Sequence, residues 1–208
     1  MPKLNDSVKA SRLNEILDAT VRSLTRHGYA GTSMRTIADE AGLTKGGLYA
    51  YIASKEALLV AVAERYFQGQ LDHLEDVRSA AAAAQLRAFL DRGAPDQDPA
   101  VAATQRAILD LWVFAGDLPE VRGALEDRYL RYRETVAGII RRGQAAGEFR
   151  DDADPVALAA LLLAARDGMV FHRIKLALPV PVGPLTDLFC ALLLAHLEVG
   201  RARSASPD

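Results

Sequence analysis

One glycine between two short helical patterns constrains the fold of this chain more than any other feature. Ser33 is of a residue type favoured as a helix N-cap, and a helix is expected to begin directly after it. That helix is short, because Gly42 supplies the positive φ that a tight turn requires. Ala38 is small enough for two helices to cross closely, and Leu43 and Leu48 supply a small shared core. Helix, glycine turn and helix in this order predict a helix-turn-helix unit.

The segments on both sides of this unit also follow helical spacing. A first helix with one buried apolar stripe is expected over residues 7–27, and Gly28 is expected to end it with a left-handed cap. The helix after the turn is expected over residues 45–51, and Ser54 is expected to cap the helix that follows. The expected amino-terminal domain, residues 1–55, therefore holds three helices.

Residues 56–208 are expected to fold into a larger helical domain. Alanine is abundant, strong helix formers dominate, and no run of β-branched residues alternates with polar ones. Breaks at residues 93–99 and 179–184 separate the expected helices, and Asp154 followed by Pro155 predicts a helix start. The expected fold class is all-α, with about nine helices in all.

Composition excludes several classes of protein. Half of the residues are hydrophobic, which is too many for a disordered chain. Cys190 is the single cysteine, so an intrachain disulfide and a cysteine-rich zinc site are excluded. The longest near-continuous apolar stretch, Val156–Ala165, is about half as long as a membrane span, and the amino end has no apolar signal segment. We therefore expect a cytoplasmic protein with no membrane partner.

The charge is spread unevenly along the chain. Residues 1–55 carry eight Lys or Arg against five Asp or Glu, while the whole chain has a formal net charge of −2. A basic end on an acidic body indicates a surface for a polyanion, although a solvated helix face gives the same excess.

Gly46 and Gly47 lie in the short segment after the turn. Each glycine costs about 1 kcal/mol relative to alanine inside a helix, so neither is there for helix stability. Two interpretations stay open: the glycines let a helix N-terminus approach a phosphate backbone closely, or residues 45–47 form a loop.

From this point the residues match a known family. The segment IADEAGLTKGGLYAYIASKEAL, residues 37–58, resembles the DNA-binding region of the TetR family of bacterial transcriptional regulators. The resemblance covers about residues 10–60 and includes Ile16, Ala19, Gly28-Tyr29 and Thr32-Ser33 upstream. The chain departs from the family pattern at Gly47, Ala50 and Ile52, which concerns the preferred DNA half-site and not the fold.

The resemblance implies a set of DNA contacts. Major-groove contacts are implied for Lys45, Tyr49 and Gly46; phosphate contacts for Thr44, Tyr51 and Lys55; and backbone or base-edge contacts for Ser33 and Arg35. Lysine can donate to guanine, and tyrosine can pack on a thymine methyl or donate to a phosphate. For the two tyrosines, core packing is the alternative.

The last two expected helices, residues 155–176 and 185–201, are strongly apolar and must bury that surface. The family resemblance implies a homodimer through these helices, with an ordinary intrachain core as the alternative. The residues expected at the dimer interface are Leu161, Ala165, Gly168, Leu188 and Leu192.

The middle helices are expected to enclose a pocket for an unknown, largely apolar small molecule. The expected pocket residues are Phe89, Leu109, Trp112, Val113, Tyr129, Tyr132, Arg166, Met169 and Phe171. Arg166, Asp167 and His172 interrupt an otherwise apolar helix, and a buried charge needs a partner. They pair with one another, or they orient a ligand.

Nothing in the sequence predicts catalysis. The histidines His27, His73, His172 and His196 are scattered without metal-ligand spacing, and no phosphate-binding loop or nucleophile elbow is present. No enzyme activity, metal or cofactor is therefore expected. The expected function is that of a homodimeric repressor that binds a near-palindromic operator in double-stranded DNA and is released by a small effector. A ligand-independent regulator or activator, and a helical small-molecule-binding protein that does not read DNA, stay open as alternatives.

Overall fold

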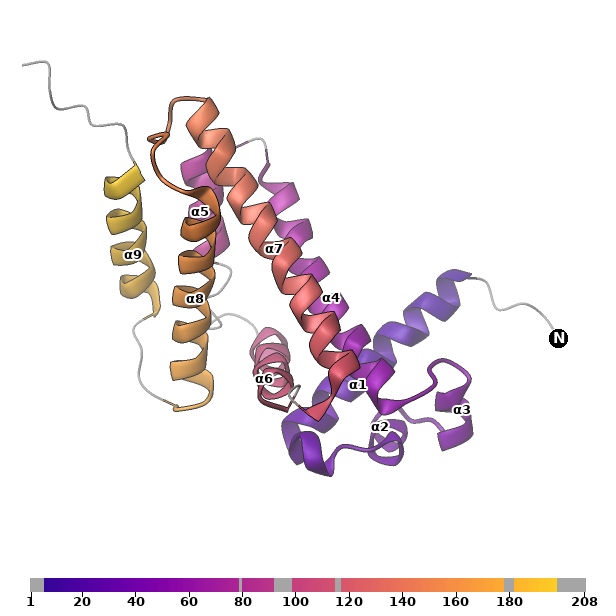
Figure 1. The fold of residues 1–208 in the computed structure, drawn as a ribbon. Helices are drawn as coiled ribbons and strands as arrows, with labels where there is room; N and C mark the ends of the chain where they lie inside the picture. The colour runs from indigo at the N-terminus through magenta and orange to yellow at the C-terminus, as the bar shows by residue number, and fades with distance from the viewer. Residues whose placement is uncertain (1–5, 79, 92–98, 115–116, 178–181, 198–208) are drawn as a thin grey trace, which may run out of the picture. The chain divides into compact units, whose positions relative to one another are not determined.

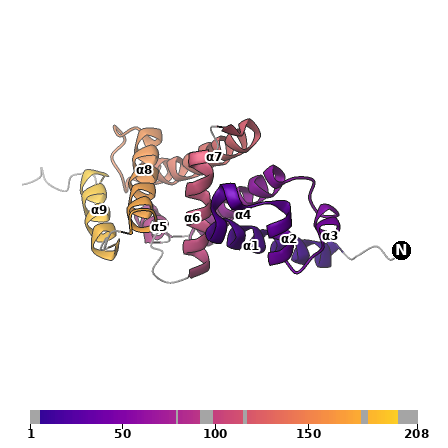
Figure 2. The same ribbon diagram turned by 90° about the horizontal axis from the view of Figure 1, so that it is seen from below.

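The structure is a computed structural model that describes residues 6–78, 80–91, 99–114, 117–177 and 182–197. These described residues form helices without a β-strand, which confirms the all-α prediction (Figures 1 and 2). The helices are α1 (Asp6–Gly31), α2 (Met34–Glu40), α3 (Lys45–Tyr49), α4 (Lys55–Asp76), α5 (Ala82–Asp91), α6 (Pro99–Phe114), α7 (Pro119–Ala145), α8 (Pro155–Ile174) and α9 (Val182–Leu197).

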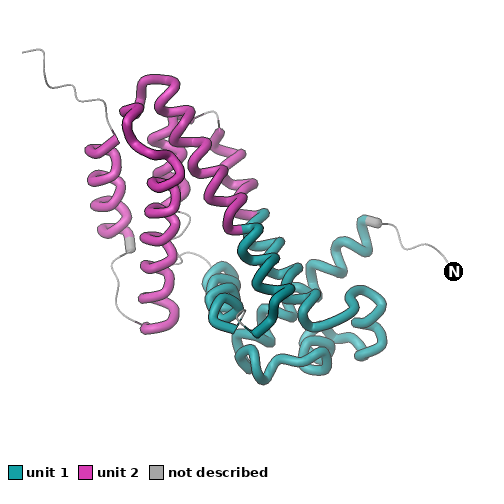
Figure 3. The backbone as a smooth tube through the Cα atoms, viewed as in Figure 1, with its two compact units in different colours: residues 1–68, 98–128 teal, residues 69–97, 129–208 magenta. Residues whose placement is uncertain are grey.

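The described chain divides into two compact units (Figure 3). Unit 1 comprises residues 1–68 and 98–128, and unit 2 comprises residues 69–97 and 129–208. The helices α4 and α7 each contribute residues to both units. The expected domain boundary after residue 55 therefore does not coincide with a boundary between compact units.

Unit 1 is built around α1. This helix packs against α2 and α6, and α2 packs against α3. Ile16, Leu24, Ile37, Leu48 and Leu58 are fully buried, so the stripe of α1 and the apolar residues of the next three helices share one core.

Unit 2 is built from α5, α8, α9 and the adjoining parts of α4 and α7. Its core includes Phe89, Tyr132, Ile140, Phe149 and Leu162, each at most 2 % exposed. The views agree that α8 and α9 lie side by side (Figures 1 and 2).

Several expected helix ends are wrong. The first regular helix is interrupted at Gly28, which has the expected positive φ (66°, with ψ −179°), but a further helical turn follows the kink and extends α1 to Gly31. The helix after the turn ends at Tyr49 and not at Tyr51. The last helix begins at Val182 and not at residue 185, and its expected end at Arg201 lies outside the described residues, as do residues 93–98 and 179–181.

The helix α8 requires a correction to the expectation about membranes. Within the described part of the chain, α8 is long and apolar enough to cross a membrane by length and composition, although the ten-residue stretch inside it had indicated otherwise. A core helix of a water-soluble protein meets the same two criteria. Ala159, Leu162, Leu163 and Arg166 on one face of α8 are buried within unit 2, and in all 28 % of the apolar window is buried.

Candidate nucleic-acid interface

The start of α2 is fixed by a reciprocal cap. The Ser33 hydroxyl accepts a hydrogen bond from the Thr36 backbone N–H at 3.2 Å, and the Thr36 hydroxyl accepts one from the Ser33 N–H at 2.9 Å. Such a capping box satisfies two backbone donors at once. The predicted N-cap at Ser33 is confirmed, and the side chain for which a DNA-backbone or base-edge contact was implied is engaged in this cap. Arg35, one residue into the helix, is exposed.

The turn between α2 and α3 also follows the prediction. Gly42 has φ 62°, a left-handed conformation that costs a residue with a Cβ atom strain. The Thr44 hydroxyl accepts a hydrogen bond from the Gly47 N–H at 3.0 Å, so Thr44 caps α3. Residues 45–49 are helical, and the alternative in which residues 45–47 form a loop is wrong.

The short helix α3 exposes its polar and aromatic side chains to solvent. Leu48 is fully buried and attaches the helix to the core, whereas Tyr49 is 46 % exposed and Lys45 and Gly46 are exposed. The Lys45 ammonium lies 5.9 Å from the centre of the Tyr49 ring. A Cβ atom at Gly46 would meet no atom within 4 Å, so this side of the helix is open. Core packing therefore does not account for Tyr49.

Tyr51 and Lys55, beyond α3, are less accessible. Tyr51 is half-buried and lines an open cleft of about 370 Å³ at the start of α1, together with Ser7, Val8, Ser11, Arg12 and Glu15. The Lys55 ammonium donates a hydrogen bond to the Tyr29 carbonyl at 2.7 Å and lies 3.8 Å from the centre of the Tyr29 ring. Burial lowers the pKa of Lys55, against the effect of Glu56. In this structure Lys55 therefore joins the start of α4 to the end of α1.

The ring of Tyr29 extends this junction to α6. It stacks on Phe114 with ring centres 4.9 Å apart, and burial raises the pKa of the Tyr29 hydroxyl. The glycine kink at residue 28 precedes this tyrosine directly, so the last residues of α1 adopt the direction that the contact needs.

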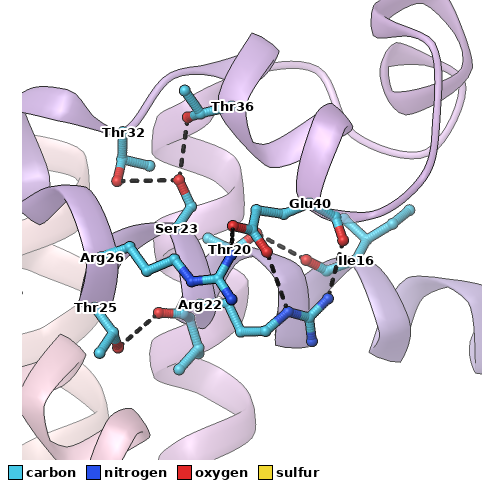
Figure 4. Close-up of polar contacts among 10 residues, drawn as sticks. Ile16, Thr20, Arg22, Ser23, Thr25, Arg26, Thr32, Thr36 and Glu40 are labelled. Carbon is cyan, nitrogen blue, oxygen red and sulfur yellow. Dashed lines mark hydrogen bonds and ion pairs between the residues drawn. The ribbon is translucent and has the colours of Figure 1, made fainter.

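A polar network between α1 and α2 was not predicted from the sequence. The buried Ser23 hydroxyl lies 3.4 Å from the Thr32 hydroxyl and 3.1 Å from that of Thr36 (Figure 4). Arg22 and Arg26 of α1 both pair with Glu40 at the end of α2. The signal in the sequence was the occurrence of hydroxyl residues, such as Ser23, within an apolar stripe.

The residues expected to line a ligand pocket are divided between the two units. Leu109, Trp112 and Val113 belong to α6 in unit 1, and Phe89, Tyr129, Tyr132, Arg166, Met169 and Phe171 belong to unit 2. Val113 is 70 % exposed and Phe171 is 41 % exposed, so neither lines the interior of the isolated chain.

Within unit 2 the structure brings Phe89, Tyr132 and Arg166 together. The Arg166 side chain is 4 % exposed and donates a hydrogen bond to the Tyr132 hydroxyl at 2.5 Å. Its guanidinium carbon lies 4.9 Å from the centre of the Phe89 ring and 5.1 Å from that of Tyr132. The arginine therefore lies against two aromatic faces.

The charged residues of α8 pair in part, as one of the two interpretations expected. Arg166 lies 3.5 Å from the Asp167 carboxylate, and His172 is exposed. Although 44 % of the Asp167 side chain is exposed, burial raises the pKa of its carboxyl group, and Arg166 opposes that shift. Burial also raises the pKa of Tyr129. The charge of Asp167 adds to this shift, and the charges of Arg166 and Arg133 oppose it.

The residues expected at a dimer interface lie on α8 and α9. Leu161 is 56 % exposed, Leu188 is 56 % exposed and Leu192 is 62 % exposed. Ala165 and Gly168 are partly exposed, and a Cβ atom at Gly168 would meet no atom within 4 Å. Each helix therefore carries apolar side chains that unit 2 of a single chain does not cover.

The part of the chain that the structure describes contains no group of three or more His, Cys, Asp or Glu residues placed to hold a metal ion. The Cys190 thiol is buried, and burial raises its pKa, so a smaller fraction of it is in the reactive thiolate form.

Sequence comparisons agree with the helix-turn-helix geometry. The family described as "Bacterial regulatory proteins, tetR family" matches residues 16–62, and the family described as "BetI-type transcriptional repressor, C-terminal" matches residues 82–198. The chain is 28 % identical over 173 residues to the helix-turn-helix-type transcriptional regulator YfiR of Bacillus subtilis, covering 81 % of this chain and 83 % of that one. It is 39 % identical over 82 residues to the transcriptional repressor KstR of Mycobacterium tuberculosis, covering 39 % of this chain and 36 % of that one.

Solved structures share the fold. A TetR transcription regulator from Haloarcula marismortui has a TM-score of 0.79 at 24 % identity, covering 91 % of this chain and all of that one. A transcriptional regulator from Saccharomonospora viridis, solved in complex with choline, has a TM-score of 0.79 at 23 % identity, covering 92 % of this chain and all of that one. With these matches over both of its parts, the chain belongs to the TetR family of bacterial regulatory proteins and is a DNA-binding transcriptional regulator, not an enzyme.

Proposed function

We propose that this regulator is a homodimeric repressor whose DNA affinity is lowered by a small effector. The observation that carries the DNA part is the outward face of α3. Lys45, Gly46 and Tyr49 are exposed while Leu48 holds the same helix in the core. A helix of five residues that exposes a cation and an aromatic ring is suited to the major groove, where lysine donates to guanine and tyrosine packs on thymine methyl groups.

The remaining implied contacts have different roles in this proposal. Arg35 adds an exposed positive charge at the start of α2. Ser33, Thr44 and Tyr51 position the backbone at helix ends or line the neighbouring cleft, and approach phosphates from there. Lys55 reaches a phosphate if its ammonium leaves the Tyr29 carbonyl.

Dimerisation is supported by the uncovered leucines of α8 and α9. Burying Leu161, Leu188 and Leu192 against a second copy removes apolar surface from water, at about 25 cal/mol for each Å². A two-fold dimer presents two copies of α3, and these fit successive major grooves of a near-palindromic operator about one helical turn apart. A regulator that acts on chromosomal DNA in this way works in the cytoplasm.

The effector part of the proposal is supported by the buried polar groups of unit 2. Gln70, Tyr132 and Arg166 extend from three different helices into one interior next to Phe89. Ligand sites of helical bundles are built from facing helices in this way, with a few polar groups in an apolar lining. Such an effector changes DNA affinity through its different affinity for the DNA-bound and released states of the dimer.

Selection of operator duplexes from a random DNA pool, with the purified full chain, tests the proposal. We expect the selected site to be near-palindromic and the bound protein to protect both half-sites from cleavage. Binding should weaken steeply as the salt concentration rises. Recovery of no preferred sequence, or of a site with a single half, would contradict the proposal. Light scattering of the same sample gives the mass of a dimer if the leucine surface pairs, and a monomer would contradict that part.

A further inference from the structure

Five residues of unit 2, called here the Arg166 cluster, are connected by polar contacts and by ring contacts. They are Gln70 of α4, Phe89 of α5, Tyr132 of α7, and Arg166 and Asp167 of α8. The Gln70 side-chain oxygen lies 3.4 Å from the Tyr132 hydroxyl, which accepts the hydrogen bond from Arg166 at 2.5 Å. Gln70, Phe89, Tyr132 and Arg166 are each at most 7 % exposed, so four of the five members lie out of water.

Stability alone does not explain an arginine at this place. Replacing a buried ionic group by apolar residues of similar size is often neutral or stabilising, because removing charges from water is costly. The Asp167 carboxylate lies 3.5 Å from Arg166 and belongs to a side chain that is 44 % exposed. This ion pair is therefore long and joins a 4 % exposed arginine to a carboxylate that solvent reaches.

A second guanidinium adds to the positive charge of this interior. The positive charges of Arg133 and Arg166 both lower the pKa of Tyr129, whereas the negative charge of Asp167 raises it. The Arg133 Nε is buried and has no hydrogen-bond partner among the described residues. The charges of both arginines and of Asp167 therefore act on Tyr129, and the buried Arg133 Nε is a donor for which the described residues supply no acceptor.

The aromatic faces of the cluster are already occupied. Phe89 and Tyr132 lie with ring centres 5.7 Å apart, and the Arg166 guanidinium lies within 5.1 Å of both. A ligand with a quaternary ammonium group is recognised by such aromatic faces. In this chain it would have to displace Arg166 and would be repelled by it, whereas a carboxylate would gain a charge-assisted hydrogen bond from the same group.

We propose that the Arg166 cluster is the head-group subsite of the effector site, and that it takes the carboxylate of an otherwise apolar small molecule and excludes cationic ligands. This inference rests on the proposed function, in which unit 2 binds an effector. It adds the chemical class of that effector and the residue that selects it.

Calorimetric titration of the full-length protein with matched compounds tests the selection. The probes are octanoate, 1-octanol and octyltrimethylammonium, and the same three head groups on a 3-phenylpropyl skeleton. We expect the carboxylate on at least one skeleton to bind at least ten-fold more tightly than its cationic twin. Equal binding, a preference for the cation, or no binding of either carboxylate would overturn the proposal.

Variants assign the preference to the cluster. Arg166→Met should weaken carboxylate binding about ten-fold to a hundred-fold, the range expected for a lost charge-assisted hydrogen bond. Arg166→Lys should keep part of the preference, and Arg141→Met, at an exposed arginine paired with Glu134, should keep all of it. A preference that survives Arg166→Met would overturn the proposal.

Asp167→Asn supplies a second test if Arg166→Met does not fold. It removes the competing carboxylate beside Arg166, so carboxylate binding should tighten. Unchanged binding in Asp167→Asn would contradict the assignment of Arg166 as the group that binds the carboxylate. Operator binding of each sample, measured without any compound, distinguishes failure of the carboxylate subsite from failure of the proposed function. A protein that binds its operator but prefers cations refutes the subsite, whereas one that binds no operator refutes the proposed function.

Discussion

The helix-turn-helix segment of unit 1 and the interior of unit 2 place their polar side chains in opposite ways. On α3, Lys45 and Tyr49 face solvent, and the local backbone is held by the Thr44 cap and by buried Leu48. In unit 2, Tyr132 and Arg166 are enclosed and bond to each other. A large polymer can only meet groups on the surface, whereas a small molecule can be surrounded. The two arrangements match the two partners that we propose.

The largest expected effect separates a buried leucine of unit 1 from an exposed leucine of unit 2. Leu48→Ala should lower the free energy of unfolding by about 2–5 kcal/mol, because this fully buried side chain attaches the five-residue helix α3 to the core. Leu161→Ala, at a 56 % exposed position, should act through the dimer instead. Urea unfolding at several protein concentrations distinguishes them, since the Leu161 effect should depend on concentration and the Leu48 effect should not.

One result would contradict the different roles expected for Leu48 and Leu161. If Leu161→Ala costs as much as Leu48→Ala at every protein concentration, the exposed surface of α8 is part of the intrachain core and not of a dimer interface.

Two glycines of α7 should respond with opposite signs. A Cβ atom at Gly143 would lie 2.2 Å from Cδ2 of Phe149 and 2.9 Å from Cβ of Ala82, so Gly143→Ala should cost about 1–3 kcal/mol. At Gly138 the nearest atom is a nitrogen of the flexible Arg142 side chain at 3.8 Å, and Gly138→Ala should stabilise by up to about 1 kcal/mol. Thermal unfolding of both variants measures the difference, and a stable Gly143→Ala protein would show that Phe149 is not packed on α7.

The smallest expected effect is a pH dependence of opposite sign at two aspartates of unit 2. Burial raises the pKa of Asp167, so its ionised form weakens the fold; the cost is absent below the ordinary pKa and grows as pH rises through the raised one. The hydrogen bond from Arg150 lowers the pKa of Asp152, so its ionised form supports the fold, and this support is lost as pH falls through the lowered pKa.

Unfolding of the two asparagine variants between pH 3 and pH 7 measures these effects, about the ordinary aspartate pKa of about 4. At pH 7, Asp167→Asn should be more stable than the unchanged protein and Asp152→Asn slightly less stable, and both differences should shrink toward pH 3. Shifts of the same sign for the two variants would contradict the burial of the Asp167 carboxylate.

The sequence predicted the local structure of unit 1 well because its signals are local. A cap at Ser33, a left-handed glycine at Gly42 and a buried Leu48 each depend on a few neighbouring residues, and the structure confirms all three. The continuation of α1 beyond Gly28 was missed, because the contact of Tyr29 with Phe114 joins residues far apart in the chain.

The interior of unit 2 was predicted in composition but not in arrangement. The sequence indicated that Arg166 interrupts an apolar helix and needs a partner, but it did not identify Tyr132 and Phe89 as its neighbours, since these lie on other helices. The exposure of Val113 and Phe171 was also missed, because helical periodicity does not show which apolar side chains the rest of the chain covers.

Affinity for the selected operator, compared between the unchanged protein and a Lys45→Ala, Tyr49→Ala double variant, tests most directly whether the outward face of α3 reads DNA. Fluorescence anisotropy should show binding weakened at least about ten-fold, with the dimer mass and the helical circular dichroism unchanged, because both side chains are exposed. Lys175→Ala in unit 2 is the matched control and should leave affinity unchanged. Undiminished operator binding by the double variant would contradict the account.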